Sequence, residues 1–252
     1  MSPVVSVDFV DPESGVAGIA RVTWSRDGAP ASALGVLLAG EASWRSSDPD
    51  DVRVEEDGER ARASLAGDGA GFEIEATRTA GASFEAGTAF ADASGVEHEL
   101  FAIRVTGGWR AGDSTGRLDC PGTLVRATGA VDWSRVELVR SLGAVLDDGA
   151  LLGVAAARPR DAAGHGDEAA SAVLLDAEGS LTRFDEPLVS TEYDPEGRPR
   201  RVGVELWGSD DEAAPVRGAG TLIGPAADVA LLRFTLDGTP GTARYELLTP
   251  TG

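Results

Sequence analysis

The sequence predicts an all-β protein built from antiparallel strands, and three observations favour that class. Apolar and polar residues alternate over short runs, for example in residues 72–76 (Phe-Glu-Ile-Glu-Ala), and a period of two is typical of a half-buried strand. Asp-Gly pairs separate several of these runs. Long helical patterns do not occur in the sequence, and its 33 Gly and 13 Pro residues would interrupt them.

The Asp-Gly pairs predict tight hairpins, because both residues tolerate the positive φ that two-residue turns require. Asp57-Gly58 stands between residues 52–55 and 61–65, and Asp237-Gly238 between residues 229–236 and 242–248. Strands recur at intervals of roughly 8–12 residues, which is typical of sandwiches and barrels. The Ala-rich residues 167–175 are the one stretch in which we expect room for a turn or two of helix.

The chain length of 252 residues suits one large β domain or two smaller ones. Glycine and proline gather in residues 107–122, and the parts before and after this region each carry several predicted hairpins. We therefore predict two domains, residues 1–125 and residues 126–252. A duplicated β unit would fit this layout, although no residue-by-residue repeat is visible.

Composition restricts the environment of the protein. Apolar residues make up 42% of the chain, enough for a substantial core. No stretch reaches the about 18 uncharged apolar residues of a membrane span, so we expect no membrane insertion. Residues 1–5 lack the basic and apolar regions of a signal peptide, and we expect a cytoplasmic protein.

The chain is strongly acidic, with a formal net charge of −20, and every basic residue other than His is Arg. This charge disfavours nucleic acid as a partner. Cys120 is the one cysteine, so no disulfide forms within the chain. We interpret Cys120 as a small buried residue at a strand end rather than as a nucleophile.

The sequence contains no complete catalytic or metal-binding motif. His98 and His165 are the only histidines, and neither lies in a metal-ligand spacing. A Gly-x-Ser-x-Gly nucleophile elbow, a phosphate-binding loop and a dinucleotide fingerprint are also missing from the sequence. We therefore predict no metal and no cofactor.

The densest group of polar residues is residues 158–168, which follow the predicted strand 151–156. Loops that follow strands often carry ligand contacts in barrels. His165 has a side-chain pKa suited to general acid/base catalysis, Glu168 would act as an acid or orient it, and Arg158 would contact a ligand. The alternative is an exposed connecting loop with a solvated histidine.

Five Trp residues are scattered along the chain. In a barrel, Trp side chains line or close the interior, and an apolar cavity with a few polar groups is the default small-molecule site. Trp109 and Trp133 flank the predicted boundary. They are predicted ligand contacts, with ordinary core packing as the alternative.

Three segments resemble the AttH-like and carotenoid 1,2-hydratase-like proteins, which are built from two lipocalin-like β-barrels packed side by side. Residues 11–22 resemble the first barrel strand, residues 129–133 (Gly-Ala-Val-Asp-Trp) the acidic-Trp element that opens the second barrel, and residues 236–246 the final hairpin. The resemblance implies two lipocalin-like antiparallel barrels with little helix. It also marks Asp132 and Trp133 as positions of interest. Residues 126–133 contain no His, whereas the family often carries an Arg-Asp-His-type run there.

Three functions remain open from the sequence. The leading hypothesis is lipocalin-like binding of an apolar small molecule, such as a lipid, an isoprenoid or a polyketide-like compound. The second is a hydratase, isomerase or cyclase on the same scaffold, with Asp132 or Glu168 as the acid and His165 as the base or orienting group. The third is a non-catalytic structural or interaction protein whose barrels are filled by side chains.

Overall fold

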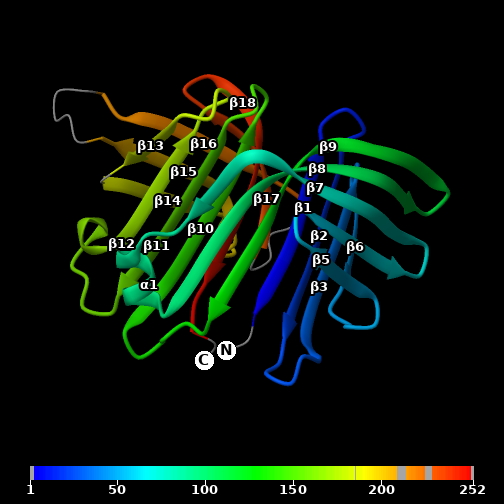
Figure 1. Ribbon diagram of the computed structural model, residues 1–252, viewed down its shortest axis with the longest axis horizontal. Helices are drawn as coiled ribbons and strands as arrows, with labels where there is room; N and C mark the ends of the chain where they lie inside the picture. The colour runs from blue at the N-terminus through cyan, green and yellow to red at the C-terminus, as the bar shows by residue number, and fades with distance from the viewer. Residues whose placement is uncertain (1–2, 185, 209–213, 225–228, 251–252) are drawn as a thin grey trace. The chain divides into compact units, whose positions relative to one another are not determined.

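The chain folds into two antiparallel β-sheets of nine strands each, which confirms the predicted all-β class (Figure 1). The computed structural model describes residues 3–184, 186–208, 214–224 and 229–250, and the side chains of residues 80–82 and 165 lie outside the described part. The first sheet contains β1 (Val4–Asp11), β2 (Val16–Trp24), β3 (Pro30–Ala39), β4 (Ala42–Ser46), β5 (Val52–Asp57), β6 (Arg60–Gly67), β7 (Ala70–Glu85), β8 (Val96–Ala111) and β9 (Ser114–Gly129). The second contains β10 (Val136–Leu146), β11 (Leu151–Pro159), β12 (Ala169–Leu175), β13 (Leu181–Phe184), β14 (Glu186–Tyr193), β15 (Pro199–Trp207), β16 (Val216–Ile223), β17 (Val229–Leu236) and β18 (Thr239–Leu248).

The two sheets have the same strand order. The first runs β4-β3-β2-β1-β9-β8-β7-β6-β5, and the second runs β13-β12-β11-β10-β18-β17-β16-β15-β14. In each sheet the first strand along the chain pairs with the last, and the fourth and fifth strands form the two edges. Each half of the chain therefore repeats the other in topology, a duplication that the sequence left open.

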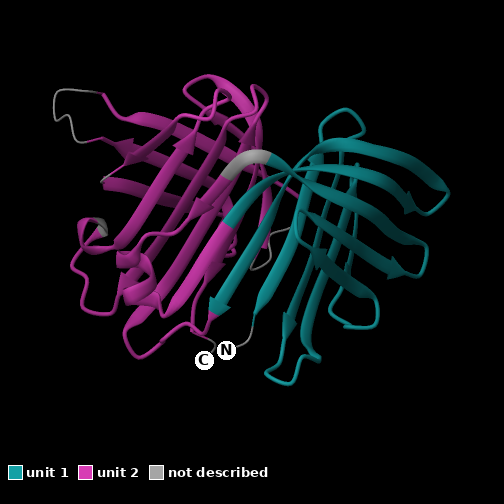
Figure 2. Cartoon of the chain, viewed as in Figure 1, with its two compact units in different colours: residues 1–81, 100–128 teal, residues 82–99, 129–252 magenta. Residues whose placement is uncertain are grey.

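The chain divides into two compact units (Figure 2). Unit 1 comprises residues 1–81 and 100–128, and unit 2 comprises residues 82–99 and 129–252. The last residues of β7, the helix α1 (Thr88–Ser94) and the first residues of β8 therefore belong to unit 2.

The predicted hairpins form at the Asp-Gly pairs. Asp57 pairs with Arg60 across the β5–β6 turn, and Leu236 pairs with Thr239 across the β17–β18 turn. Asp237 and Gly238 both have positive φ, 44° and 87°. These are the conformations that a two-residue hairpin turn requires, and they explain why this dipeptide stands between two strands.

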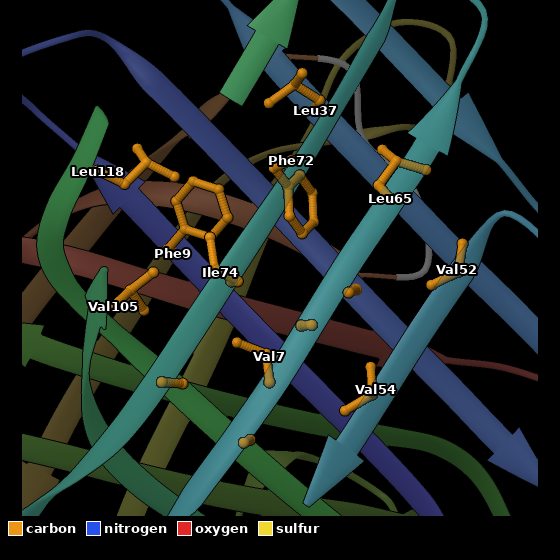
Figure 3. Close-up of a cluster of buried hydrophobic side chains, with 14 of the residues drawn as sticks. Val7, Phe9, Leu37, Val52, Val54, Leu65, Phe72, Ile74, Val105 and Leu118 are labelled. Carbon is orange, nitrogen blue, oxygen red and sulfur yellow. The ribbon is translucent and has the colours of Figure 1, made fainter. Parts of the chain in front are cut away.

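The core of unit 1 lies on one face of its sheet, where alternate residues are apolar (Figure 3). Phe9 and Phe72 meet edge to face, with ring centroids 5.3 Å apart and an interplanar angle of 88°. Gly18 lies directly under this pair, because a Cβ there would stand 2.5 Å from the Phe9 ring. Cys120 is buried in the same core, and burial raises the pKa of its thiol to about 12. An un-ionised thiol is a poor nucleophile.

The short helix α1 was not predicted from the sequence. It packs against β11 and β12, and Phe90 is buried there. Gly95, with φ of 76°, ends the helix in the left-handed conformation that favours glycine. Among the described helices, none combines the length and the apolar character needed to cross a membrane.

The prediction of a helical turn within residues 167–175 is wrong for most of that stretch. Residues His165–Asp167 form a single 3-10 turn, and the remainder is the strand β12. Hydrogen bonding to β11 on one side and β13 on the other holds this Ala-rich segment extended. Pairing with two neighbours therefore overrides the helical preference of Ala.

Candidate functional site

The inner face of the second sheet is apolar except at one end. Leu142 and Ala144 of β10 and Ala243 of β18 belong to its core cluster. Arg140 and Tyr245 have the same phase on these two strands, so they share that inner face. Both are buried. A charged and a phenolic side chain therefore interrupt an otherwise apolar surface.

Arg140 forms a buried ion pair with Glu168, which immediately precedes β12. Arg140 Nη2 donates to a carboxylate oxygen of Glu168, and each side chain is only 4% exposed. Arg140 Nη1 also donates to the backbone oxygen of Val189 on the edge strand β14, at 2.6 Å. Buried charges cost several kcal/mol each unless they are paired and hydrogen-bonded. Here both conditions are met.

Tyr245 is the second polar feature of this face. Its hydroxyl lies 2.7 Å from Thr191 Oγ1 on β14, and the residue is 1% exposed. Burial raises the pKa of Tyr245 to about 12, while the hydrogen bond between Tyr245 and Thr191 and the charge of Arg140 oppose that rise. The phenol is therefore neutral at ordinary pH.

We name Arg140, Glu168, Thr191 and Tyr245 the inner polar cluster. It combines a neutral phenol, an alcohol and a fixed ion pair in a surrounding of low polarity. A neutral phenol in such a place donates a hydrogen bond or a proton to an oxygen atom of a bound molecule. Among the residues that the structure describes, no group of three or more His, Cys, Asp or Glu is placed to hold a metal ion.

Asp132 lies in the turn that precedes β10. Its carboxylate accepts hydrogen bonds from the Ser134 hydroxyl at 2.6 Å and from the Ser134 backbone N–H at 3.1 Å. These bonds lower the pKa of Asp132. Its backbone oxygen accepts from the N–H groups of Arg135 and Val136. The geometry fits a residue that shapes the turn and stays ionised.

Trp133 and Arg158 lie at the same end of the second sheet as the inner polar cluster. Arg160 Nε donates to the backbone oxygen of Trp133 at 2.7 Å, which joins this turn to the end of β11. Arg158 forms a partly exposed ion pair with Glu137, at 3.0 Å. The structure thus brings these two predicted ligand contacts into neighbouring segments.

Two predicted site residues remain, His165 and Trp109, and the structure does not bring them into the inner polar cluster as described side chains. The backbone of His165 begins the 3-10 turn just before Glu168, but its side chain is outside the described part. Trp109 belongs to unit 1, where it packs against the core and lines a depression of about 720 Å³. A Cβ on Gly116 would stand 2.6 Å from Trp109 Nε1, so the indole lies directly over that glycine.

Sequence reasoning missed Arg140, Thr191 and Tyr245. The signal in the sequence was the alternation of inward and outward side chains along each strand. Arg140 lies two residues from Leu142 and four from Ala144, and Tyr245 lies two residues from Ala243, so they point to the same face as these core residues. A charged residue in phase with core residues indicates a paired buried charge. The partners lie 28, 49 and 54 residues apart along the chain, so no local pattern reveals them.

A depression of about 750 Å³ lies over β14–β17 of unit 2. The outward-phase residues Arg201, Glu205 and Arg217 line it, and Arg217 Nε lies 3.1 Å from Glu205. None of the five predicted site residues with described side chains contributes to its lining.

The chain resembles three solved structures over nearly its whole length. An AttH-type protein from Nitrosomonas europaea has 15% sequence identity and a TM-score of 0.68, and the match covers 98% of this chain and 91% of that one. Kievitone hydratase from Nectria haematococca has 10% identity and a TM-score of 0.65, with 99% and 89% covered. CghA in complex with Sch210972 has 11% identity and a TM-score of 0.59, with 99% and 88% covered.

These similarities show a shared fold and no more, because every sequence identity is far below 25%. No protein-family model matches the chain, and no curated protein matches it. The resemblance noted in residues 11–22, 129–133 and 236–246 is confirmed at the level of architecture. The chain has the double-lipocalin fold of these structures.

Proposed function

We propose that this protein is a hydratase-type enzyme that acts on an apolar small molecule at the inner polar cluster of unit 2. The observation that carries the proposal is Tyr245, a buried neutral phenol beside an ion pair on an apolar inner face. The fold shared with kievitone hydratase supports the same class of reaction.

In this proposal Tyr245 is the general acid. Removal of water breaks a C–O bond, and the departing hydroxyl takes a proton from the Tyr245 phenol. A base accepts the proton of the neighbouring carbon, and addition of water follows the reverse path. We assign that base role to His165, whose backbone lies three residues before Glu168. Arg140 and Glu168 position the substrate oxygen, and Trp133 and Arg158 contact the apolar body.

A second candidate is binding without turnover. Asp132, the acid expected from the sequence, keeps its proton less readily because of its bonds to Ser134. If Tyr245 only anchors a ligand oxygen, the protein is a carrier rather than an enzyme. Loss of the phenol would then weaken binding, whereas in the enzyme it would reduce turnover.

Native mass spectrometry of gently purified protein, followed by extraction, is the first test. We expect an apolar compound to be retained, and incubation in ¹⁸O-labelled water to place label in it. Kievitone is the defined probe, with gain or loss of one water as the product signal. Tyr245→Phe should lower the rate by about 100-fold or more while leaving the Kd of the probe within about threefold.

Tyr193→Phe is the matched control, because Tyr193 is the other tyrosine and is 50% exposed. It should behave as the unmodified protein. Full turnover in Tyr245→Phe would contradict the acid role. Two results together would favour a carrier: the unmodified protein exchanges no label, and Tyr245→Phe binds the probe about tenfold more weakly.

A further inference from the structure

The hydroxyl of Tyr245 belongs to a residue that solvent barely reaches. Tyr245 is 1% exposed and is part of the core cluster of the second sheet. A general acid gives up its proton in each catalytic cycle and has to regain one before the next cycle. A buried phenol in this role therefore needs a path along which a proton returns from water.

Thr191 is the described residue that is placed to provide this path. Its Oγ1 lies 2.7 Å from the Tyr245 hydroxyl, and either oxygen can be the donor. A hydroxyl both donates and accepts hydrogen bonds, so this contact can pass a proton in either direction. The charge of Arg140 also acts on the phenol, but a guanidinium keeps its protons in proteins and cannot relay one.

Exposure to solvent rises along one face of the edge strand β14. Val189 is 4% exposed, Thr191 is partly exposed and Tyr193 is 50% exposed, and these alternate residues share a face of the strand. Arg140 Nη1 donates to the backbone oxygen of Val189, which holds the strand in place two residues before Thr191. Thr191 therefore stands at the boundary between the apolar interior and solvent.

We propose that Thr191 is a proton relay that connects the buried Tyr245 hydroxyl with solvent at the edge of unit 2. The catalytic use of this path rests on the function proposed above, whereas the path itself does not. Thr191 acts through Tyr245 rather than on the substrate.

The relay completes the proton balance of the proposed reaction. Once the departing hydroxyl has taken the phenol proton, Tyr245 is a phenolate and the base is protonated. The phenolate takes the proton of the Thr191 hydroxyl, while the Thr191 oxygen takes a proton from a water molecule. The hydroxide left behind accepts the proton of the base and becomes water, which restores both groups.

The exchange rate of the Tyr245 hydroxyl proton with solvent tests the relay without any substrate. In protein labelled with ¹³C at Cζ of Tyr and dissolved in a mixture of H₂O and D₂O, slow exchange gives separate NMR signals for the protonated and deuterated hydroxyl. Faster exchange merges these signals. The chain has two tyrosines, and Tyr193, at 50% exposure, is the internal reference for fast exchange.

Thr191→Val keeps the branched shape of the side chain and removes the hydroxyl. We expect it to slow exchange of the Tyr245 hydroxyl by about tenfold or more, because the phenol loses its link to solvent. Thr191→Ser keeps a hydroxyl and should stay within about threefold of the unmodified protein. Ser190→Ala is the matched control, because Ser190 donates to the backbone oxygen of Gly203 and has the opposite phase on β14. It should leave the rate unchanged.

A purely structural contact would give the opposite result. Loss of a hydrogen bond that only holds β14 in place would loosen the edge of the sheet, admit water and speed up exchange. Unchanged or faster exchange in Thr191→Val would therefore overturn the relay. Thermal unfolding verifies that each variant is folded. If Thr191→Val does not fold, Thr191→Ile, which also lacks the hydroxyl, decides by the same criterion.

Turnover of kievitone separates the relay from the proposed function. Slower exchange in Thr191→Val, with no turnover by the unmodified protein, would overturn the proposed function and support the proton path. Unchanged exchange in Thr191→Val, with turnover by the unmodified protein, would overturn the relay and leave the acid role of Tyr245 in place.

Discussion

Arg126 and Tyr245 occupy the same position in the two sheets. Each lies on the last strand of its sheet, four residues after the glycine of a Pro-Gly-Thr run, Gly122 or Gly241. Gly122 pairs with β1 and Gly241 pairs with β10, the first strand of each sheet. Both side chains share the inner face with the core residues of their strand.

From this shared position both side chains reach the fifth strand of their sheet. Arg126 bonds Glu56 on β5, and Tyr245 bonds Thr191 on β14. The two units therefore retain a polar contact to the same edge strand while its chemistry differs. In unit 1 it is an ion pair, and in unit 2 it is a contact between neutral hydroxyls. This difference is why we assign a neutral oxygen atom of the substrate to the inner polar cluster of unit 2.

The two glycines of the repeated run should resist substitution. A Cβ on Gly122 would stand 2.4 Å from the backbone oxygen of Asp8, and one on Gly241 would stand 2.4 Å from that of Val145. Backbone in the middle of a sheet cannot move aside cheaply. We expect Gly122→Ala and Gly241→Ala each to lower the free energy of unfolding by about 1–3 kcal/mol, measured by urea denaturation.

Gly208→Ala is the control for this pair, because no atom of the described residues lies within 4 Å of a Cβ there. It should change stability by less than about 0.5 kcal/mol. If Gly122→Ala proved as stable as Gly208→Ala, the close approach of β9 to β1 would not restrict that position.

The buried pair of Arg140 and Glu168 should show strong coupling. Glu168→Leu leaves a buried guanidinium without its carboxylate, and we expect a loss of about 3–5 kcal/mol in unfolding free energy. Arg140→Met should cost a similar amount, whereas the double variant should cost clearly less than the sum. A double-mutant cycle should give a coupling of about 2 kcal/mol or more.

The exposed pair of Arg62 and Glu75, at 75% and 66% side-chain exposure, provides the comparison cycle. Its coupling should stay below about 1 kcal/mol. Equal coupling in both cycles would mean that water reaches the Arg140–Glu168 pair.

The fold was predictable from the sequence where local chemistry decides it. Asp237-Gly238 forms its hairpin because the two residues accept positive φ, and that preference is visible in any dipeptide. Residues 169–175 became a strand through pairing with β11 and β13, which no local pattern records. The seven-residue helix α1 is too short to show a clear period, and its stability comes from burial of Phe90.

The candidate site was less predictable, and the reason is distance along the chain. Glu168 was singled out as part of a polar loop, yet its partner Arg140 stands within an apolar strand. Tyr245 acquires its raised pKa from burial, which depends on strands from the whole second half of the chain. Pairings of this kind follow from the order of the strands in the sheet.

Phe84 and Gly153 should depend on each other. A Cβ on Gly153 of β11 would stand 2.3 Å from Cγ of the Phe84 ring, at the rigid base of that side chain. Gly153→Ala should therefore cost about 1–3 kcal/mol in unfolding free energy. In a Phe84→Ala background the same change should cost under about 0.5 kcal/mol, because the obstacle is gone. If Gly153→Ala lowers the free energy of unfolding equally in both backgrounds, the strain does not come from the contact with Phe84.

The stability of the protein should fall at alkaline pH for two identifiable reasons. The chain has no Lys, so Cys and Tyr dominate side-chain titration between about pH 9 and pH 12. Burial raises the pKa of Cys120 from 9.0 to about 12 and that of Tyr245 from 10.0 to about 12. The folded state thus holds both protons more tightly than the unfolded chain, and stability is lost as pH rises above each unfolded value.

By pH 11 the loss should reach about 3 kcal/mol from Cys120 and about 1 kcal/mol from Tyr245, since one pKa unit corresponds to about 1.4 kcal/mol. Urea unfolding at intervals from pH 8 to pH 11 measures the slope. Cys120→Ala should remove the part that begins near pH 9, and Tyr245→Phe the part that begins near pH 10. Tyr193→Phe is the control, because Tyr193 is 50% exposed, and it should leave the slope unchanged. A slope that persists in the Cys120→Ala, Tyr245→Phe double variant would mean that another group, or opening of the sheets, governs alkaline unfolding.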